Sequence, residues 1–198
     1  MKNYFHSWIG KNYSTGGMFK IPILILGESI YEWEGEKISS DRVVELVRNN
    51  ATGIESHKFY TNIFSSFTDN ERNVENKNEF WESVSHFNYI IQPIQGGPRI
   101  PPTDEMIKEA QNEFFNRIQA LGTIPTCMVV LGKRLWNYYL PEQGEKGPEI
   151  EVNDIKHETW IYKCNNKNIF TTWIYHPSSG FSSEYWFPII RKFLLMQH

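Results

Sequence analysis

A chain of 198 residues with 40% hydrophobic and 15% aromatic side chains can bury a sizeable core and is too apolar to be disordered. Its net charge of -3 is unusual for a protein that binds nucleic acid, so DNA contacts would need a local positive surface, such as one at Lys133 and Arg134. Two cysteines are too few for an iron-sulfur cluster or a disulfide scaffold, and there is no apolar run of membrane-spanning or signal-peptide type. We therefore expect one monomeric cytoplasmic domain over residues 1–198, without a metal or a cofactor.

The first predicted strand is the apolar run at residues 21–26, which ends in a tight turn at Gly27. A helix is expected over residues 41–48, with Ser40 as its N-cap. The stretch that follows, residues 51–78, is polar and irregular between its aromatic residues. Its sequence pattern predicts neither a helix nor a strand.

The clearest helix lies in the middle of the chain. A short helix at residues 78–85 leads to a strand or its exit loop at residues 86–92. After a long turn rich in glycine and proline, Thr103 caps the clear helix and Gly122 ends it. Its apolar stripe at helical spacing consists of Met106, Ala110, Phe114, Ile118 and Leu121.

The second half of the chain continues the alternation of strands and helices. A buried strand at residues 126–131 precedes a helix at 132–140, and strands at 158–163 and 169–175 precede a closing helix at 183–196. Strands that alternate with helices predict an α/β fold. We expect a three-layer α/β/α sandwich with a central, mostly parallel sheet of about four strands.

Three polar side chains, Glu28, Asn88 and His176, fall at carboxyl ends of predicted strands, where open α/β sheets bind ligands. Glu28 could activate a water, although a glutamate after a strand is more often a cap or a surface charge. The Asn88 amide could read the edge of a base or satisfy local backbone. His176 could donate to an oxygen on which charge develops, or sit in a capped turn. A nucleophile elbow at positions 27–31 is disfavoured because Tyr31 replaces its second glycine.

Together these motifs resemble the uracil-DNA glycosylase superfamily. The first motif of that superfamily is similar to GESIY at positions 27–31, its base-reading asparagine to Asn88, and its His-Pro-Ser motif to HPSSG at positions 176–180. The closest resemblance is to the family that carries an iron-sulfur cluster. Its Arg-x-Pro-Thr-x-x-Glu turn and its later strand ending in Leu-Gly are similar to residues 99–105 and 129–132. The resemblance covers residues 21–195, apart from an uncertain stretch after Tyr31.

The chain also departs from that family's pattern. The cluster cysteines are absent, so no cluster is implied, and Ile30 replaces the motif proline. Ser29 stands where one family keeps an aspartate that handles water, which leaves Glu28 for that role. The segment between the first motif and Asn88 is long for the family. Its aromatic residues, any of which could stack on a base, are Trp33, Phe59, Tyr60, Phe64 and Phe67.

The resemblance implies hydrolysis of the N-glycosidic bond of a flipped base, with water as the nucleophile. Glu28 would align the water, His176 would donate to the departing base, and Asn88 would hold the edge of the base. The base-binding residues implied are Gly27, Ser29, Tyr31, Phe87 and Asn88. The implied DNA contacts are Arg99, Lys133, Arg134, Ser178 and Ser179, with Phe181 as either a wedge in the duplex or a core contact.

Two substrates and two further functions stay open. In the uracil-specific family, a tyrosine at the fifth position of the first motif excludes thymine, and the resemblance implies that Tyr31 could do the same and select uracil for base-excision repair. Ser29, Ile30 and the aromatic insertion favour a modified pyrimidine such as a phage hypermodified cytosine, which is a role in phage defence. The expected partner is single- or double-stranded DNA, including modified phage DNA. The alternatives are a non-catalytic nucleic-acid binder on the same fold and an α/β hydrolase of a small molecule.

Overall fold

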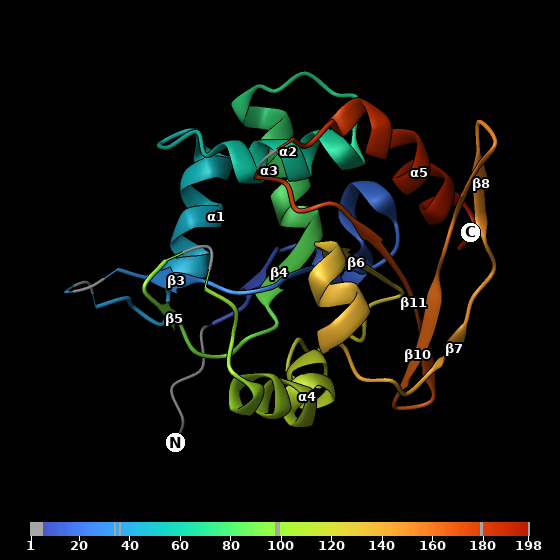
Figure 1. Cartoon of the computed structure of the whole chain (residues 1–198). Helices are drawn as coiled ribbons and strands as arrows, with labels where there is room; N and C mark the ends of the chain where they lie inside the picture. The colour runs from blue at the N-terminus through green and yellow to red at the C-terminus, as the bar shows by residue number, and fades with distance from the viewer. Residues whose placement is uncertain (1–5, 34, 36, 98–99, 179, 198) are drawn as a thin grey trace.

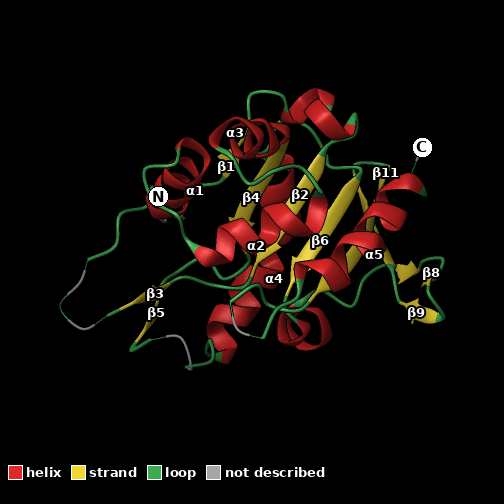
Figure 2. Ribbon diagram, turned by 90° about the horizontal axis from the view of Figure 1, so that it is seen from above, coloured by secondary structure: helices red, strands yellow, loops and turns green. Residues whose placement is uncertain are grey.

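The computed structural model describes residues 6–33, 35, 37–97, 100–178 and 180–197, which form a three-layer α/β/α sandwich (Figures 1 and 2). In spatial order, the strands of the central sheet are β1 (Trp8–Ile9), β4 (Val84–Asn88), β2 (Ile23–Gly27), β6 (Cys127–Leu131), β11 (Lys167–Ile174), β10 (Trp160–Cys164) and β7 (Glu145–Lys146). The four strands from β4 to β11 run parallel, and β1, β10 and β7 are antiparallel additions at the two edges. The mostly parallel core predicted from the sequence is thus confirmed, within a larger sheet.

The central strands are short apolar runs because both of their faces are covered. All five residues of β2 and all five of β6 are buried. The predicted strands at 21–26 and 126–131 therefore exist, with boundaries moved by one or two residues. The hairpin between β10 and β11 turns at Asn165 and Asn166, whose φ angles of 48° and 61° are tolerated by asparagine better than by most residues.

Helices form the two outer layers of the sandwich. They are α1 (Arg42–Thr52), α2 (Lys58–Phe67), α3 (Val74–Ser83), α4 (Asp104–Gln119) and α5 (Ser183–Leu195), with short 3-10 turns η1 (Tyr13–Thr15) and η2 (Gly17–Phe19) and the π-helical turn η3 (Leu135–Tyr139). Figures 1 and 2 show α2, α3 and α5 on one face of the sheet and α4 on the other. In the part of the chain described, no helix combines the length and apolar character needed to cross a membrane.

The largest difference from the sequence prediction is α2, which lies in the stretch to which no element was assigned. Its buried residues Tyr60, Ile63, Phe64 and Phe67 do have helical spacing. The start of the helix was missed because its N-cap is His57, whose imidazole accepts a hydrogen bond from the Phe59 backbone N–H. Histidine is not among the residues that N-cap preferences favour.

Other boundaries also differ from the prediction. The helix expected at 78–85 begins at Val74, where the Asn73 side chain caps it, and ends before β4 begins at Val84. Ser40 does not cap α1, because Asp41 occupies the N-cap position and makes no side-chain capping bond. Two small sheets accompany the main one: a parallel pair, β3 (Tyr31–Glu32) with β5 (Ile94–Gln95), and an antiparallel pair, β8 (Ile150–Val152) with β9 (Ile155–His157).

Candidate active site

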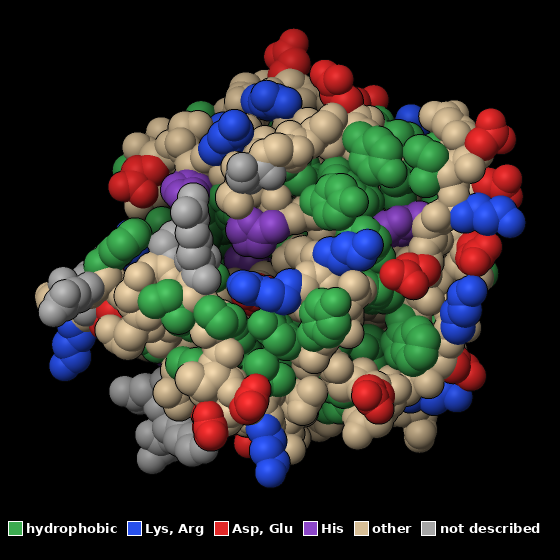
Figure 3. Space-filling view, viewed as in Figure 1, with side chains coloured by type: hydrophobic (Ala, Val, Ile, Leu, Met, Phe, Trp, Pro, Cys, Tyr) green, Lys and Arg blue, Asp and Glu red, His purple; other side chains and the backbone are tan. Residues whose placement is uncertain are grey.

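A cavity of about 260 Å³ opens where β2, β6 and β11 end. Segments that are far apart in the sequence meet here because parallel neighbours present their carboxyl ends at one edge of the sheet. Figure 3 shows a hollow near the centre of this face, bordered by histidine and basic side chains. Apart from the glycine, every residue in the lining was a candidate from the sequence. The lining consists of Glu28, Tyr31, Gly132, Lys133, Arg134, His176 and Ser178.

Glu28 lies in this cavity with both carboxylate oxygens bound by Arg134. The Arg134 Nε donates to Oε2 at 3.0 Å, and the Nη2 donates to Oε1. The Glu28 side chain is only 8% exposed, whereas that of Arg134 is 41% exposed. The hydrogen bond and charge of Glu28 raise the pKa of Arg134, so the guanidinium stays protonated. Arg134, expected from the sequence to contact phosphate, is therefore first of all the partner of Glu28.

His176 follows β11 and is held by contacts on two sides. Its Nδ1 lies 2.8 Å from the Ser178 hydroxyl, which leaves Nε2 for a ligand. On the other side, the Phe59 ring of α2 packs with its centroid 5.2 Å from that of the imidazole. The Asn62 side chain, one turn along α2, donates to the Pro177 carbonyl at 2.7 Å. Helix α2 thus fixes the loop that carries His176.

The environment of His176 favours a neutral imidazole. Although His176 is exposed, partial loss of water around the ring lowers its pKa, the nearby Glu28 carboxylate raises it, and the Arg134 charge lowers it again, with a net downward shift. When the Ser178 hydroxyl donates to Nδ1, the single ring proton sits on Nε2. His176 can then donate one hydrogen bond to an oxygen in the cavity.

Asn88 is buried and is not among the residues that line this cavity, although it ends the strand next to β2. Asn88 and Gly27 are partners in the β2–β4 register, and a Cβ on residue 27 would overlap the Asn88 Oδ1. Arg117 of α4 donates to the carbonyls of Asn88 and Tyr89 at 2.8 and 3.0 Å. Glycine at position 27 is therefore needed for the Asn88 amide to lie against the β2 backbone.

Several candidate residues have positions that revise their expected roles. The Phe87 ring is fully buried with the Arg117 guanidinium 4.3 Å from its centroid, so this side chain cannot contact a base. Phe181 is partly buried and packs against the hydrophobic core, which is the second of its two expected roles. Ser29 has a buried hydroxyl with no hydrogen-bond partner in the described part of the chain. Arg99 and Ser179 lie outside the described residues.

The aromatic residues of the insertion differ in their positions relative to the core and the cavity. Tyr60, Phe64 and Phe67 are buried in the core, and the exposed Trp33 lies against Gly97. Phe59 contacts the pocket residue His176. Sequence reasoning had placed Phe59 among five equal candidates and had missed Asn62 and Arg117 altogether. A helical reading of residues 58–67 would have put Phe59 and Asn62 near one face, but not against His176.

No protein-family model and no curated protein matches the sequence. Among the residues that the structure describes, no group of three histidine, cysteine, aspartate or glutamate side chains could hold a metal ion.

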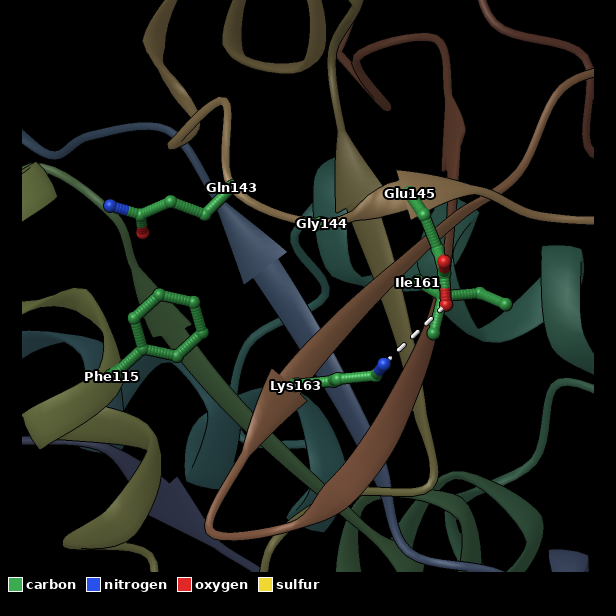
Figure 4. Close-up of a pocket in the computed structure, with 6 residues that line it drawn as sticks. All are labelled: Phe115, Gln143, Gly144, Glu145, Ile161 and Lys163. Atoms are coloured by element: carbon green, nitrogen blue, oxygen red, sulfur yellow. Dashed lines mark ion pairs between the residues drawn. The ribbon is translucent and has the colours of Figure 1, made fainter.

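A second hollow of about 320 Å³ lies between α4 and the strands β7 and β10 (Figure 4). Its charged groups are Lys163 and Glu145, which face each other across neighbouring antiparallel strands with Nζ and Oε1 3.8 Å apart. Phe115 and Gln143 form another part of its wall. No sequence motif points to this hollow.

Proposed function

We propose that the protein is a DNA glycosylase that hydrolyses the N-glycosidic bond of a flipped, non-standard base and leaves an abasic site. The observation that carries this proposal is the meeting of Glu28 and His176, from loops about one hundred and fifty residues apart, in one cavity at the carboxyl edge of the sheet. The order of the motifs along the chain supports it as well, because each motif resembles one of the uracil-DNA glycosylase superfamily.

In this mechanism the bond between the sugar C1′ and the base nitrogen breaks, and its electron pair leaves with the base. The Nε2–H of His176 donates to a base oxygen as negative charge grows there. Glu28 aligns a water whose oxygen bonds to C1′, and the water proton passes to the carboxylate. Asn88, the β4 partner of Gly27, holds the edge of the base through its amide.

Arg134 modifies the role of Glu28 because a carboxylate paired with a guanidinium stabilises a sugar cation less than a free carboxylate does. The partly exposed guanidinium also has N–H groups that do not bind Glu28. A DNA phosphate can accept hydrogen bonds from these groups, and its negative charge then offsets part of the guanidinium charge next to the carboxylate. Lys133 and Ser178 at the rim are further phosphate donors.

The base is either uracil or a modified pyrimidine, and both fit a role for Tyr31 as a wall of the pocket. Phe59 is the aromatic residue of the insertion that we expect to stack on the base, because its ring packs on the His176 imidazole. Uracil corresponds to base-excision repair, and a phage-modified base to phage defence.

The test uses oligonucleotides that carry uracil, modified cytosines or only ordinary bases, as single strands and as duplexes. We expect alkali-labile abasic sites on at least one non-standard base and none on ordinary DNA. Glu28→Gln, which removes the carboxylate charge, should lose most of this activity while the protein still folds. His6→Ala, at an exposed histidine outside the cavity, is the matched control and should be fully active. The absence of abasic sites on every substrate would reject the proposal.

A second candidate is a non-catalytic nucleic-acid binder on the same fold. The occupation of both Glu28 oxygens by Arg134 favours it. In that case wild type binds DNA, creates no abasic site on any substrate, and is unaffected by Glu28→Gln.

A further inference from the structure

An exposed aromatic pair, Tyr175 and Tyr185, lies next to the candidate active site, and we call it the aromatic patch. Tyr175 is 50% exposed and follows β11, and Tyr185 is 43% exposed and lies in the first turn of α5. Both rings pack at nearly right angles on the buried Trp186, with centroids 5.2 and 5.0 Å away. Tyr175 also contacts Trp173, with the centroids 5.5 Å apart, but the exposed part of each tyrosine remains open to another partner.

The base of the patch is rigid. Trp186 contacts Trp173, and both contact His157, whose Nε2 lies 2.9 Å from the Trp173 carbonyl. The tyrosines therefore pack on a buried base, which reduces the side-chain entropy that they lose when a ligand binds. Exposed rings on a fixed base are suited to stacking.

One lysine connects the patch to the cavity. Lys133 lines the cavity, and its Nζ lies 5.6 Å from the centroid of Trp173, the ring that also contacts Tyr175. Tyr175 directly precedes His176 in the chain. On the face of the molecule in Figure 3, basic side chains lie between the histidine-lined hollow and an apolar surface. A ligand that extends from the cavity would thus contact first the Lys133 ammonium group and then the exposed rings of the aromatic patch.

We propose that the aromatic patch binds unpaired bases of single-stranded DNA that flank the base in the cavity, with a phosphate on Lys133. This inference rests on the proposed function for the identity of the ligand. Only an unpaired strand offers free base faces to protein rings, because each base in a duplex is stacked on its neighbours. The patch has acidic neighbours, Glu158 bound to the Trp173 indole and Glu184 next to Tyr185, so we expect the phosphates to stay on the Lys133 side.

The experiment measures binding of short labelled oligonucleotides made only of ordinary bases, so that no base removal is needed for the readout. Wild type should bind a single strand more tightly than the matching duplex or an RNA of the same sequence. Tyr175→Ala and Tyr185→Ala should each weaken single-strand binding by about 5- to 150-fold, the range for loss of one stacked base. Tyr175→Phe and Tyr185→Phe keep the ring and should bind like wild type.

Tyr138→Ala is the matched control, because Tyr138 is a strongly exposed tyrosine on η3 that is not part of the patch. Tighter binding of the duplex or the RNA, normal single-strand binding by the two alanine variants, or an equal loss in Tyr138→Ala overturns the proposal. Its failure is distinct from that of the proposed function. Abasic sites with normal binding by the alanine variants remove the patch proposal alone, and weakened binding without any abasic site removes the glycosylase proposal alone.

Discussion

Two of the hollows in the described structure have similar volumes, about 260 Å³ at the carboxyl edge of the sheet and about 320 Å³ beside α4 (Figure 4), but their ion pairs differ in burial. At the carboxyl edge, Glu28 is nearly buried and bound through two hydrogen bonds by Arg134. In the hollow beside α4, Lys163 and Glu145 are 69% and 61% exposed and form one long ion pair. Exposed pairs of this kind contribute little to stability.

The difference shows that convergence, rather than size, marks a candidate site. The groups at the carboxyl edge follow three parallel strands, and both Glu28 and His176 are oriented by second residues, Arg134 for the first and Ser178 and Phe59 for the second. Those beside α4 come from neighbouring antiparallel strands and one helix surface. Burying and pairing polar groups costs free energy that a surface can avoid, so a chain that does so in a cavity usually gains function in return.

The largest expected effect separates the two hollows by activity. His176→Ala removes the hydrogen-bond donor to the departing base, and we expect the rate of base removal to fall by about 10²–10³-fold, or about 3–4 kcal/mol in the barrier. Lys163→Ala, in the hollow beside α4, should change the rate less than twofold. Single-turnover measurements on the best oligonucleotide substrate would check both. An equal fall in the rate of base removal in the two variants would contradict the assignment of the active site to the carboxyl edge of the sheet.

The next effect is on stability at low pH, and it concerns the strand next to β2. His86 of β4 is completely buried, which lowers its pKa from 6.5 to about 4, although its Nδ1 lies 2.9 Å from the Ile25 carbonyl. Because the pKa of His86 is lower in the folded protein, the unfolded chain binds more protons at low pH. The contribution of His86 to the free energy of unfolding is therefore complete above pH 6.5 and is lost as the pH falls toward 4. The loss reaches about 3 kcal/mol.

Urea unfolding of wild type and His86→Gln between pH 7 and pH 4 measures this slope. The glutamine variant should show a flatter dependence, because the residue at position 86 no longer titrates. The hollow beside α4 has no histidine in its lining, so Lys163→Ala should keep the slope of wild type. An unchanged slope in His86→Gln would mean that the acid sensitivity comes from another group.

A smaller effect compares the two ion pairs directly. Arg134→Met leaves the Glu28 carboxylate buried and unpaired, and we expect the free energy of unfolding to fall by about 2 kcal/mol, below the value for fully buried pairs because Arg134 is partly exposed. Adding Glu28→Gln to Arg134→Met should recover part of the loss. Lys163→Met should cost less than about 0.5 kcal/mol. Urea unfolding at neutral pH checks all three, and equal costs for the two single variants would remove the distinction.

Much of the fold follows from local sequence patterns. The apolar runs that became β2 and β6 and the stripe of α4 behind Thr103 are strong because period, cap and burial agree within one segment. The candidate site was partly predictable for a related reason. Parallel strands bring their carboxyl ends to one edge, so Glu28 and His176 could be expected to meet before their contacts were known.

The rest depends on tertiary contacts that no local pattern encodes. The pairing of Glu28 with Arg134 joins residues 106 positions apart. The packing of α2 on the His176 loop depends on a helix with an uncommon cap. Phe87 was expected to bind the base because it precedes Asn88, but strand alternation turns its ring toward Arg117 and the core. Neighbours in sequence at a strand end thus face opposite layers.

The smallest effect tests whether α2 positions the histidine. Asn62→Ala removes the hydrogen bond to the Pro177 carbonyl, a contribution of about 1 kcal/mol, so we expect kcat to fall about fivefold with little change in KM. The matched amide is Gln143 beside α4, and Gln143→Ala should leave both constants unchanged. A purely structural role for Asn62 would lower the free energy of unfolding and leave kcat intact. A fall in kcat, beyond the loss of about 1 kcal/mol in stability, is therefore the result that ties the helix missed in the sequence to the chemistry of the site.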